Sequence, residues 1–504
     1  MSEPARRPQL RLVHIVYAVL IYSALVTAAW PRRTYDVWWH LATGRYIVQE
    51  GVIPHADVFT HTREGEPWTA HEWLWEVIMY ALYARWGFAG LIAMKALLCA
   101  GAAAALTWIS LRRGAMPLVV MTVGTLGIFA ARALFNVRPQ LASLVLLTVL
   151  LVLVHLAREG RWRWLWLAPG GMLLWVNLHG GFIFGIAFMG LFAMCLIPGW
   201  LRPKPDDQPR QPPIGVMAGV LALMALACLA NPNGLSGALY PFEYLTGASA
   251  GYKQIVTEYA SPNFSAAMFS FLGPYMLVML AAFALSRKRL DLFDLAVSVV
   301  FLYLALLWQR NVALFVFATA PIVALQLSDF ARERLTPGRE RTGSSDGGSQ
   351  LVYVAVIICL AMSSVFALRS AMGRVDEVFA EDYPVECLHV AQELNLRGPM
   401  FNTYRWGGYL IWHMYPDQHV FIDGRADVMG PELMADWVRC HKLEPGWRDV
   451  LDRYDIQWAL ITRKSPLCRA LRMTSDFRLV RATDEAELFI RDPGVNSPAS
   501  RTTP

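Results

Sequence analysis

The first 40 residues decide the fold class, because an apolar run leads directly into a cluster of acidic, aromatic and imidazole side chains. Residues 12–40 read LVHIVYAVLIYSALVTAAWPRRTYDVWWH. The apolar part, at 12–30, has the length of a membrane-crossing helix, and Arg6, Arg7 and Arg11 precede it. It is too long for the apolar core of a signal peptide, and no small-residue cleavage pattern follows. We therefore expect a retained first span.

The rest of the chain repeats this apolar pattern. Of its 504 residues, 56% are hydrophobic and 17% are charged, whereas soluble proteins carry about 25% charged residues. This composition excludes a soluble enzyme and predicts a polytopic α-helical membrane protein with about eleven transmembrane helices. The predicted spans lie at about 12–30, 89–110, 116–134, 139–157, 163–178, 181–200, 214–231, 266–286, 291–308, 311–328 and 351–372.

The connections between these spans predict the orientation. Every second connection is basic, and short cytoplasmic loops accumulate Lys and Arg, so we expect a cytoplasmic N-terminus and an extracytoplasmic C-terminal region in a bacterial plasma membrane. This topology requires that 71–88 lies along the membrane surface instead of crossing it. It also explains the net charge of +6 without nucleic acid, which we do not expect as a partner.

The polar segments predict the domain organisation. We expect a transmembrane domain at 1–375, with a first outer loop at 31–88 and a disordered cytoplasmic linker at 329–350. An extracytoplasmic α/β domain should follow at 376–492, and a frayed tail at 493–504. In the α/β domain we expect strands at 399–402, 418–422, 456–462 and 486–490, and helices at 383–395, 407–414, 431–440, 446–453 and 466–472.

The first outer loop carries two acidic motifs. Asp36 and His40 would share one face of a helix, and an acidic group there could take the proton of an acceptor hydroxyl or hold a divalent metal. Glu72 and Glu76 follow His71 and lie one helical turn apart. A metalloprotease HExxH motif is excluded, because Trp stands where the second His would be. A purely structural interpretation is equally consistent with these residues: Asp36 would cap a helix, and residues 72–76 would form the solvated face of a second helix.

Polar groups also lie at the outer ends of later spans. Arg138 and Arg310 need anionic partners at membrane depth, which could be Asp36, Glu72 and Glu76 or a bound phosphate. The same outer ends hold His179 and Asn231. Taken singly, a turn or a snorkelling arginine explains each of them.

The outer domain offers a second set of ligand candidates. Asp423 and Asp427 follow a predicted strand and could bind a metal or sugar hydroxyls, with Tyr404 and Trp406 as stacking surfaces. A capped turn, in which Asp423 pairs with Arg425, is equally consistent with these residues. The seven cysteines show no zinc-site spacing or disulfide framework.

These motifs carry a family resemblance. The stretches DVWWHLATG at 36–44, HEWL at 71–74, NLHGG at 177–181 and FIDGRAD at 421–427 resemble a bacterial group within the GT-C superfamily of integral-membrane glycosyltransferases. The resemblance implies a catalytic Asp36, with Glu72 and Glu76 as second acidic candidates, and a polyprenyl-phosphate-linked sugar as donor among the membrane lipids.

The implied reaction is a single displacement at the anomeric carbon. Asp36 would act as general base, and Arg138 or Arg310 would stabilise the departing lipid phosphate. His40, His71 and His179 could hold the phosphate or orient the carboxylate. A divalent cation, Mg²⁺ or Mn²⁺ at Asp36, stays open, because the chain lacks the Asp-x-Asp pair of several GT-C families.

Several points stay open at this stage. The acceptor could be a glycan, a lipid or a protein. A lipid-linked sugar transporter should show symmetric halves, which we do not find. A non-catalytic envelope assembly protein would need no acidic first loop.

Overall fold

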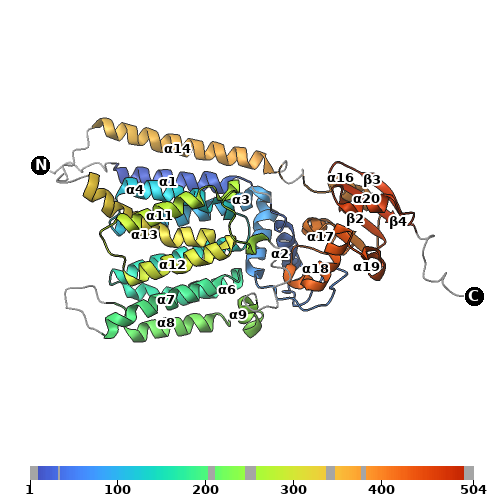
Figure 1. Cartoon of the computed structure of the whole chain (residues 1–504), viewed down its shortest axis with the longest axis horizontal. Coiled ribbons are helices and arrows are strands. Elements are labelled where there is room, and N and C mark those ends of the chain that lie inside the picture. The colour runs from blue at the N-terminus through green and yellow to red at the C-terminus, as the bar shows by residue number, and fades with distance from the viewer. Residues whose placement is uncertain are drawn as a thin grey trace, which may run out of the picture. The chain divides into compact units, whose positions relative to one another are not determined.

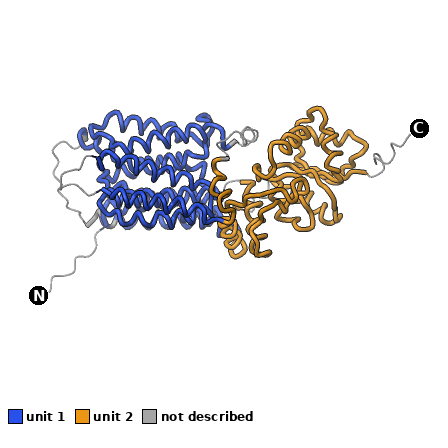
Figure 2. Tube along the Cα trace, turned by 90° about the horizontal axis from the view of Figure 1, so that it is seen from below, with its two compact units in different colours: residues 1–31, 88–231, 256–373 blue, residues 32–87, 232–255, 374–504 orange. Residues whose placement is uncertain are grey.

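The structure is a computed structural model that is mostly helical and carries a small sheet near its C-terminus (Figure 1). It describes residues 10–31, 34–201, 211–243, 257–335, 347–375, 378 and 382–492. The chain divides into two compact units, which Figure 2 draws in different colours. Unit 1 comprises 1–31, 88–231 and 256–373, and unit 2 comprises 32–87, 232–255 and 374–504.

Unit 1 is a bundle of apolar helices. Its helices are α1 (Leu12–Ala29), the second part of α3 (Trp73–Arg112), α4 (Pro117–Ala131), α5 (Gln140–Arg158), α6 (Ala168–Leu178), α7 (Phe182–Leu201), α8 (Ile214–Ala227), α11 (Leu272–Leu285), α12 (Leu292–Leu307), α13 (Val312–Leu335) and α14 (Gly347–Gly373). The core forms around α13, which packs against α4, α5, α11 and α12 and is buried over most of its length.

The eleven predicted spans all coincide with helical segments of unit 1. Eight helices of the described chain are long and apolar enough to cross a membrane, and α8 and α12 are shorter apolar helices. The predicted run at 163–178 divides into the 3₁₀ helix η2 (Trp162–Leu167) and α6, with Pro169 at the start of α6. A multi-pass membrane protein is thereby supported, while the number of crossings and their orientation stay predictions.

The predicted disordered linker at 329–350 overlaps the ends of two helices. Residues 329–335 continue α13, and 347–350 begin α14. The prediction there was wrong because the apolar pattern ends before the helices do, and a polar helix end needs no buried face. The remainder of the predicted linker and the predicted tail at 493–504 lie outside the described residues.

Unit 2 joins the first outer loop to the C-terminal α/β region. It contains α2 (Val37–Glu50), the first part of α3, α9 (Gly234–Glu243) and the C-terminal elements. The latter are α16 (Val385–Glu393), β1 (Met400–Asn402), η7 (Tyr404–Trp406), α17 (Gly407–Met414), α18 (Ala426–Lys442), α19 (Trp447–Arg453), β2 (Trp458–Thr462), α20 (Pro466–Arg472), β3 (Phe477–Ala482) and β4 (Ala486–Arg491).

The sheet has four strands in the order β1-β2-β4-β3. β1 pairs parallel with β2, and β4 pairs antiparallel with both β2 and β3. Three of the predicted strands and all five predicted helices are present. The sequence did not predict β3, because this edge strand is mostly exposed and shows no buried apolar alternation.

The fourth predicted strand, at 418–422, is not part of this sheet. Instead, its backbone bonds to the first outer loop, with Val420 and Thr60 forming an isolated parallel bridge. The side-chain oxygen of Asn402 accepts hydrogen bonds from the amides of Phe421 and Ile422 at 2.9 and 3.3 Å. A side chain therefore satisfies the backbone where we expected a strand neighbour.

The division into units differs from the predicted domains in one respect. The first outer loop groups with the C-terminal region and not with the apolar helices, because α2 packs against α17. α3 belongs to both units and contains a non-helical residue, Gly87, whose φ of 59° favours glycine. Residues 73–86, which we expected to lie along the membrane surface, belong to unit 2.

Candidate functional site

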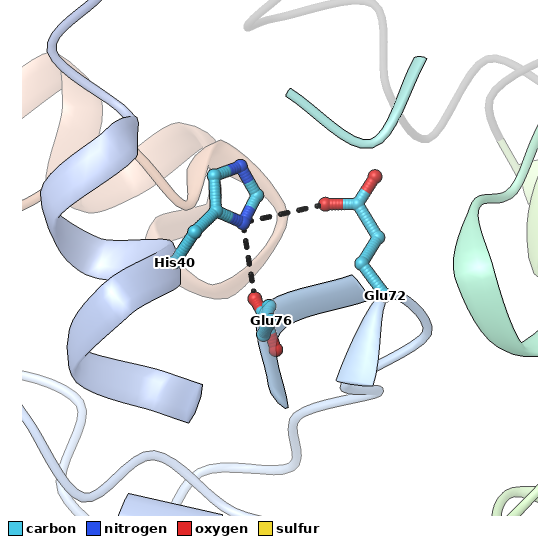
Figure 3. A group of neighbouring side chains, drawn as sticks. All are labelled: His40, Glu72 and Glu76. Atoms are coloured by element: carbon cyan, nitrogen blue, oxygen red, sulfur yellow. Dashed lines mark hydrogen bonds and ion pairs between the residues drawn. The ribbon is translucent and has the colours of Figure 1, made fainter. Parts of the chain in front are cut away.

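The first outer loop forms a compact group of one imidazole and two carboxylates (Figure 3). His40 lies on the first turn of α2, Glu72 directly precedes α3, and Glu76 lies on the first turn of α3. Nδ1 of His40 is 3.1 Å from Oε1 of Glu76 and 3.8 Å from Oε2 of Glu72. The imidazole therefore faces both predicted acidic residues.

A close helix contact holds this group together. A Cβ atom on Gly44 would lie 2.1 Å from the backbone oxygen of Glu76, so only glycine permits this approach of α2 to α3. Gly44 lies one turn after His40, which places the imidazole beside Glu76. His40 and Glu76 are each 1% exposed, and Oε2 of Glu76 has no hydrogen-bond partner among the described residues. Burying a charged carboxylate oxygen in this way is costly unless the group is protonated or a ligand completes its contacts.

The same three residues could hold a divalent cation. One ligand atom from each of His40, Glu72 and Glu76 lies within 4.8 Å of the others. A mixed nitrogen and oxygen set suits Zn²⁺ or Mn²⁺, whereas Mg²⁺ prefers oxygen ligands alone. Asp36, the metal ligand that the sequence suggested, is not part of this group.

Asp36 occupies the N-cap position of α2, but its side chain makes no capping hydrogen bond to the helix. Its carboxylate instead approaches the C-terminal region, since a Cβ atom on Gly424 would lie 2.7 Å from Oδ1 of Asp36 and 2.9 Å from Nε1 of Trp39. Asp36 is thus the N-cap residue that we considered, but its carboxylate lies near Gly424 and does not bond to the helix.

A further network extends from Glu72 to the loop at 423–427. Nε2 of His71 is 3.5 Å from Oε1 of Glu72, and the His71 ring lies 4.2 Å from that of Tyr240 on α9. The Tyr240 hydroxyl donates a 3.0 Å hydrogen bond to Oδ2 of Asp427. Burial lowers the pKa of His71, but the charges of Glu72 and Asp427 outweigh it, so the pKa is raised. The sequence offered no signal for Tyr240.

Arg425 is the centre of a buried ion triad. Its Nη2 lies 2.6 Å from Oδ2 of Asp423 and 2.7 Å from Oδ1 of Asp57, and all three side chains are fully buried. The guanidinium also lies over the rings of Phe59 and Trp68, at 5.0 and 4.5 Å. The Asp423–Arg425 pair, which we considered as the alternative to a ligand site, is therefore present. Asp57 joins the first outer loop to it.

The two aromatic residues predicted as stacking surfaces differ in exposure. Trp406 is fully buried, and its Nε1 donates a 2.7 Å hydrogen bond to the backbone oxygen of Asp382. It therefore offers no ring face to a ligand. Tyr404 is partly exposed, and its ring lies 5.8 Å from that of Trp437.

Unit 1 contains a separate polar cavity. It is lined by three of the predicted phosphate-binding residues, Arg138, His179 and Arg310, and by two asparagines that neighbour these arginines in the sequence, Asn136 and Asn311. Its other polar lining residues, which the sequence did not indicate, are Gln140, Ser143 and Glu258. The fourth predicted residue, Asn231, is not among them, and its side chain donates a 2.8 Å hydrogen bond to the backbone oxygen of Cys228.

The two arginines of this cavity have partners within unit 1. Arg138 forms an ion pair with Glu258, and Nη1 of Arg310 donates a 2.7 Å hydrogen bond to the hydroxyl of Tyr259. We had expected Asp36, Glu72, Glu76 or a phosphate as the anionic partner of Arg138. The sequence missed Glu258 because it lies in a short 3₁₀ helix, η4 (Thr257–Tyr259), with no apolar pattern to mark it.

Comparison with known proteins gives structural neighbours only. No protein-family model and no curated protein matches the sequence. The oligosaccharyltransferase AglB of Archaeoglobus fulgidus, in complex with an inhibitory peptide and a dolichol-phosphate, is similar with a TM-score of 0.51 and 10% identity; the match covers 96% of this chain and 75% of AglB. Apo ArnT of Cupriavidus metallidurans is similar with a TM-score of 0.51 and 13% identity, over 95% and 97% of the chains.

A second structure of the Archaeoglobus oligosaccharyltransferase, in its apo form, is also similar. It has a TM-score of 0.52 and 11% identity, and the match covers 89% of this chain and 69% of that chain. At these identities the likeness shows the fold alone. The chain therefore shares the fold of these proteins, which agrees with the predicted fold class of a polytopic helical membrane domain and a C-terminal α/β region.

Proposed function

We propose that the protein is a membrane glycosyltransferase that moves a sugar from a polyprenyl-phosphate donor to an acceptor at the extracytoplasmic face. The observation that carries the proposal is the buried imidazole and carboxylate group of His40, Glu72 and Glu76 in the first outer loop. The fold supports it, because one structure that shares this fold contains a dolichol-phosphate.

The residues of unit 2 would bind and activate the acceptor. We propose Asp36 as general base, since it is only partly buried and its side chain is not used to cap α2. Glu72 is the second acidic candidate. His40 and Glu76 are too buried to meet a substrate directly and would instead orient Glu72. If a divalent cation binds, His40, Glu72 and Glu76 would hold it, and it would polarise an oxygen of the substrate.

The cavity of unit 1 would bind the phosphate of the donor. Arg138 and Arg310 can each donate two parallel hydrogen bonds to a phosphate, a geometry that guanidinium groups favour. His179 lines the same cavity, and its Nδ1 accepts a hydrogen bond from the amide of Gly181 at 3.0 Å. The proton of the neutral ring is then on Nε2, which can donate to a phosphate oxygen.

The reaction would be a single displacement with inversion at the anomeric carbon. The acceptor oxygen forms a bond to that carbon, its proton passes to Asp36, and the bond from the carbon to the phosphate oxygen breaks. The electron pair leaves with the polyprenyl phosphate, whose charge cationic side chains would stabilise.

Mass spectrometry of envelope glycans and lipid-linked sugars from a strain that lacks the gene tests this function. We expect an accumulated polyprenyl-phosphate sugar and a glycan, lipid or protein that lacks one sugar. Accumulation of the donor on one side of the membrane, with transfer intact, would indicate a transporter instead. Unchanged glycans and lipids would contradict the proposal.

A further inference from the structure

We propose that the loop at 423–427 forms the acceptor side of this site, and that Asp427 binds an uncharged, hydroxyl-bearing acceptor such as a sugar residue. The inference rests on the proposed transferase function and names the acceptor class. It assigns to the C-terminal region a direct part in substrate selection.

The first observation is the position of Asp427. Its Oδ2 accepts the hydrogen bond of Tyr240, whose ring lies against that of His71. Nε2 of His71 in turn lies 3.5 Å from Oε1 of Glu72. Asp427 thus belongs to the polar network that contains Glu72 and Glu76, although hundreds of residues separate them in the chain.

The second observation separates the two aspartates of the loop. Asp423 is fully buried, and Arg425 binds both of its oxygens at 2.6 to 3.1 Å, so it is committed to the fold. Asp427 is partly exposed, and Tyr240 is its only hydrogen-bond partner among the described residues. The buried triad therefore anchors the loop, while the Asp427 carboxylate keeps an oxygen for a ligand.

The third observation is the close approach of this loop to the proposed base. Gly424 leaves no room for a Cβ atom beside Oδ1 of Asp36 and Nε1 of Trp39. Nε1 of Trp39 is buried and has no hydrogen-bond partner among the described residues. The oxygen of a hydroxyl group can accept this hydrogen bond while its proton is donated to a carboxylate, because a hydroxyl donates and accepts at once.

The charges then select the class of acceptor. Asp36, Glu72 and Asp427 are all acidic, and the guanidinium of Arg425 is already paired with two other carboxylates. A phosphorylated or carboxylated acceptor would meet like charges here. A neutral sugar instead donates hydroxyl hydrogen bonds to carboxylates.

Saturation-transfer NMR on the purified full-length protein tests this inference. The probes are a neutral panel, methyl α-mannopyranoside, methyl β-glucopyranoside and methyl β-galactopyranoside, and one anionic analogue, methyl β-glucuronide. We expect a signal from at least one neutral glycoside and none from the glucuronide. Asp427→Asn should raise the glucuronide signal relative to the neutral one by about fivefold, since one repelling charge is removed.

Two further variants separate a specific effect at Asp427 from a general effect of charge or folding. Asp484→Asn removes an exposed carboxylate of the same unit, which pairs with Arg463, and should change neither signal. Tyr240→Phe keeps the charge of Asp427 but removes its hydroxyl partner, so it should weaken neutral glycoside binding and preserve the discrimination. The Tyr240→Phe result stands even if Asp427→Asn fails to fold.

Binding of undecaprenyl phosphate is measured on the same samples. Wild-type protein that binds the lipid but no neutral glycoside, or that prefers the glucuronide, would overturn the inference and leave the donor assignment intact. Protein that binds neutral glycosides but not the lipid would support the acceptor site and contradict the proposed donor.

Discussion

The ion triad of Arg425, Asp57 and Asp423 makes the sharpest prediction about stability. We expect Arg425→Met to destabilise unit 2 strongly, because it leaves two carboxylates in a fully buried site without their cation. Removing one partner of a buried ion pair costs about 3–5 kcal/mol. In a unit of this size, about 1 kcal/mol shifts the melting temperature by about 2–4 °C, so the shift should reach at least about 6 °C.

Thermal unfolding of the full chain in detergent measures this shift. The matched control is Arg481→Met, which breaks the Arg481–Glu386 pair, where the side chains are 51% and 64% exposed. Solvent screens such an exposed pair, so its loss should change stability little. Neutralising the two aspartates as well, in Asp57→Asn/Asp423→Asn/Arg425→Met, should recover much of the loss. If Arg425→Met has the same melting temperature as the Arg481→Met control, the triad does not anchor the loop.

Three further predictions concern pH, packing and the donor. Burial lowers the pKa of His61 despite its hydrogen bond to the backbone oxygen of Met400, so the folded state favours the neutral imidazole. The stability that His61 contributes is therefore present above pH 6.5 and is lost as the pH falls below that value. Replacing it, in His61→Gln, should make the melting temperature fall less steeply on the acid side of its pH profile. Gly424→Ala places a Cβ against Asp36 and should lower transfer activity while costing at most about 3 kcal/mol in stability, measured by assay and thermal unfolding. Glu258→Gln removes the carboxylate that pairs with Arg138 and should strengthen undecaprenyl phosphate binding in native mass spectrometry, whereas equal or weaker binding would argue against a phosphate at this arginine.

The sequence was informative about the helices of unit 1 because their signal is local. An apolar run of spanning length needs no partner to be recognised, and all eleven predicted runs are helical. The C-terminal helices were also predictable from their periodicity. The strand at 477–482 was not, since its side chains face solvent and its identity depends on pairing with β4.

The candidate site was predictable in composition but not in arrangement. Spacing placed Glu72 and Glu76 together, whereas nothing local joined His40 to Glu76 or Asp427 to Tyr240. Those contacts depend on tertiary packing, such as the approach of α2 to α3 at Gly44. Sequence spacing cannot report a contact between segments that meet only in the folded chain.

The central claim is that Asp36 in the first outer loop acts as the general base of sugar transfer. The most direct test is mass spectrometry of lipid-linked sugars and envelope glycans from the deletion strain, complemented with Asp36→Asn or with the control Asp484→Asn at equal protein levels. We predict that Asp36→Asn leaves the donor accumulated and lowers transfer by at least about 100-fold, while Asp484→Asn restores it. Full restoration of the glycan by Asp36→Asn would contradict the account.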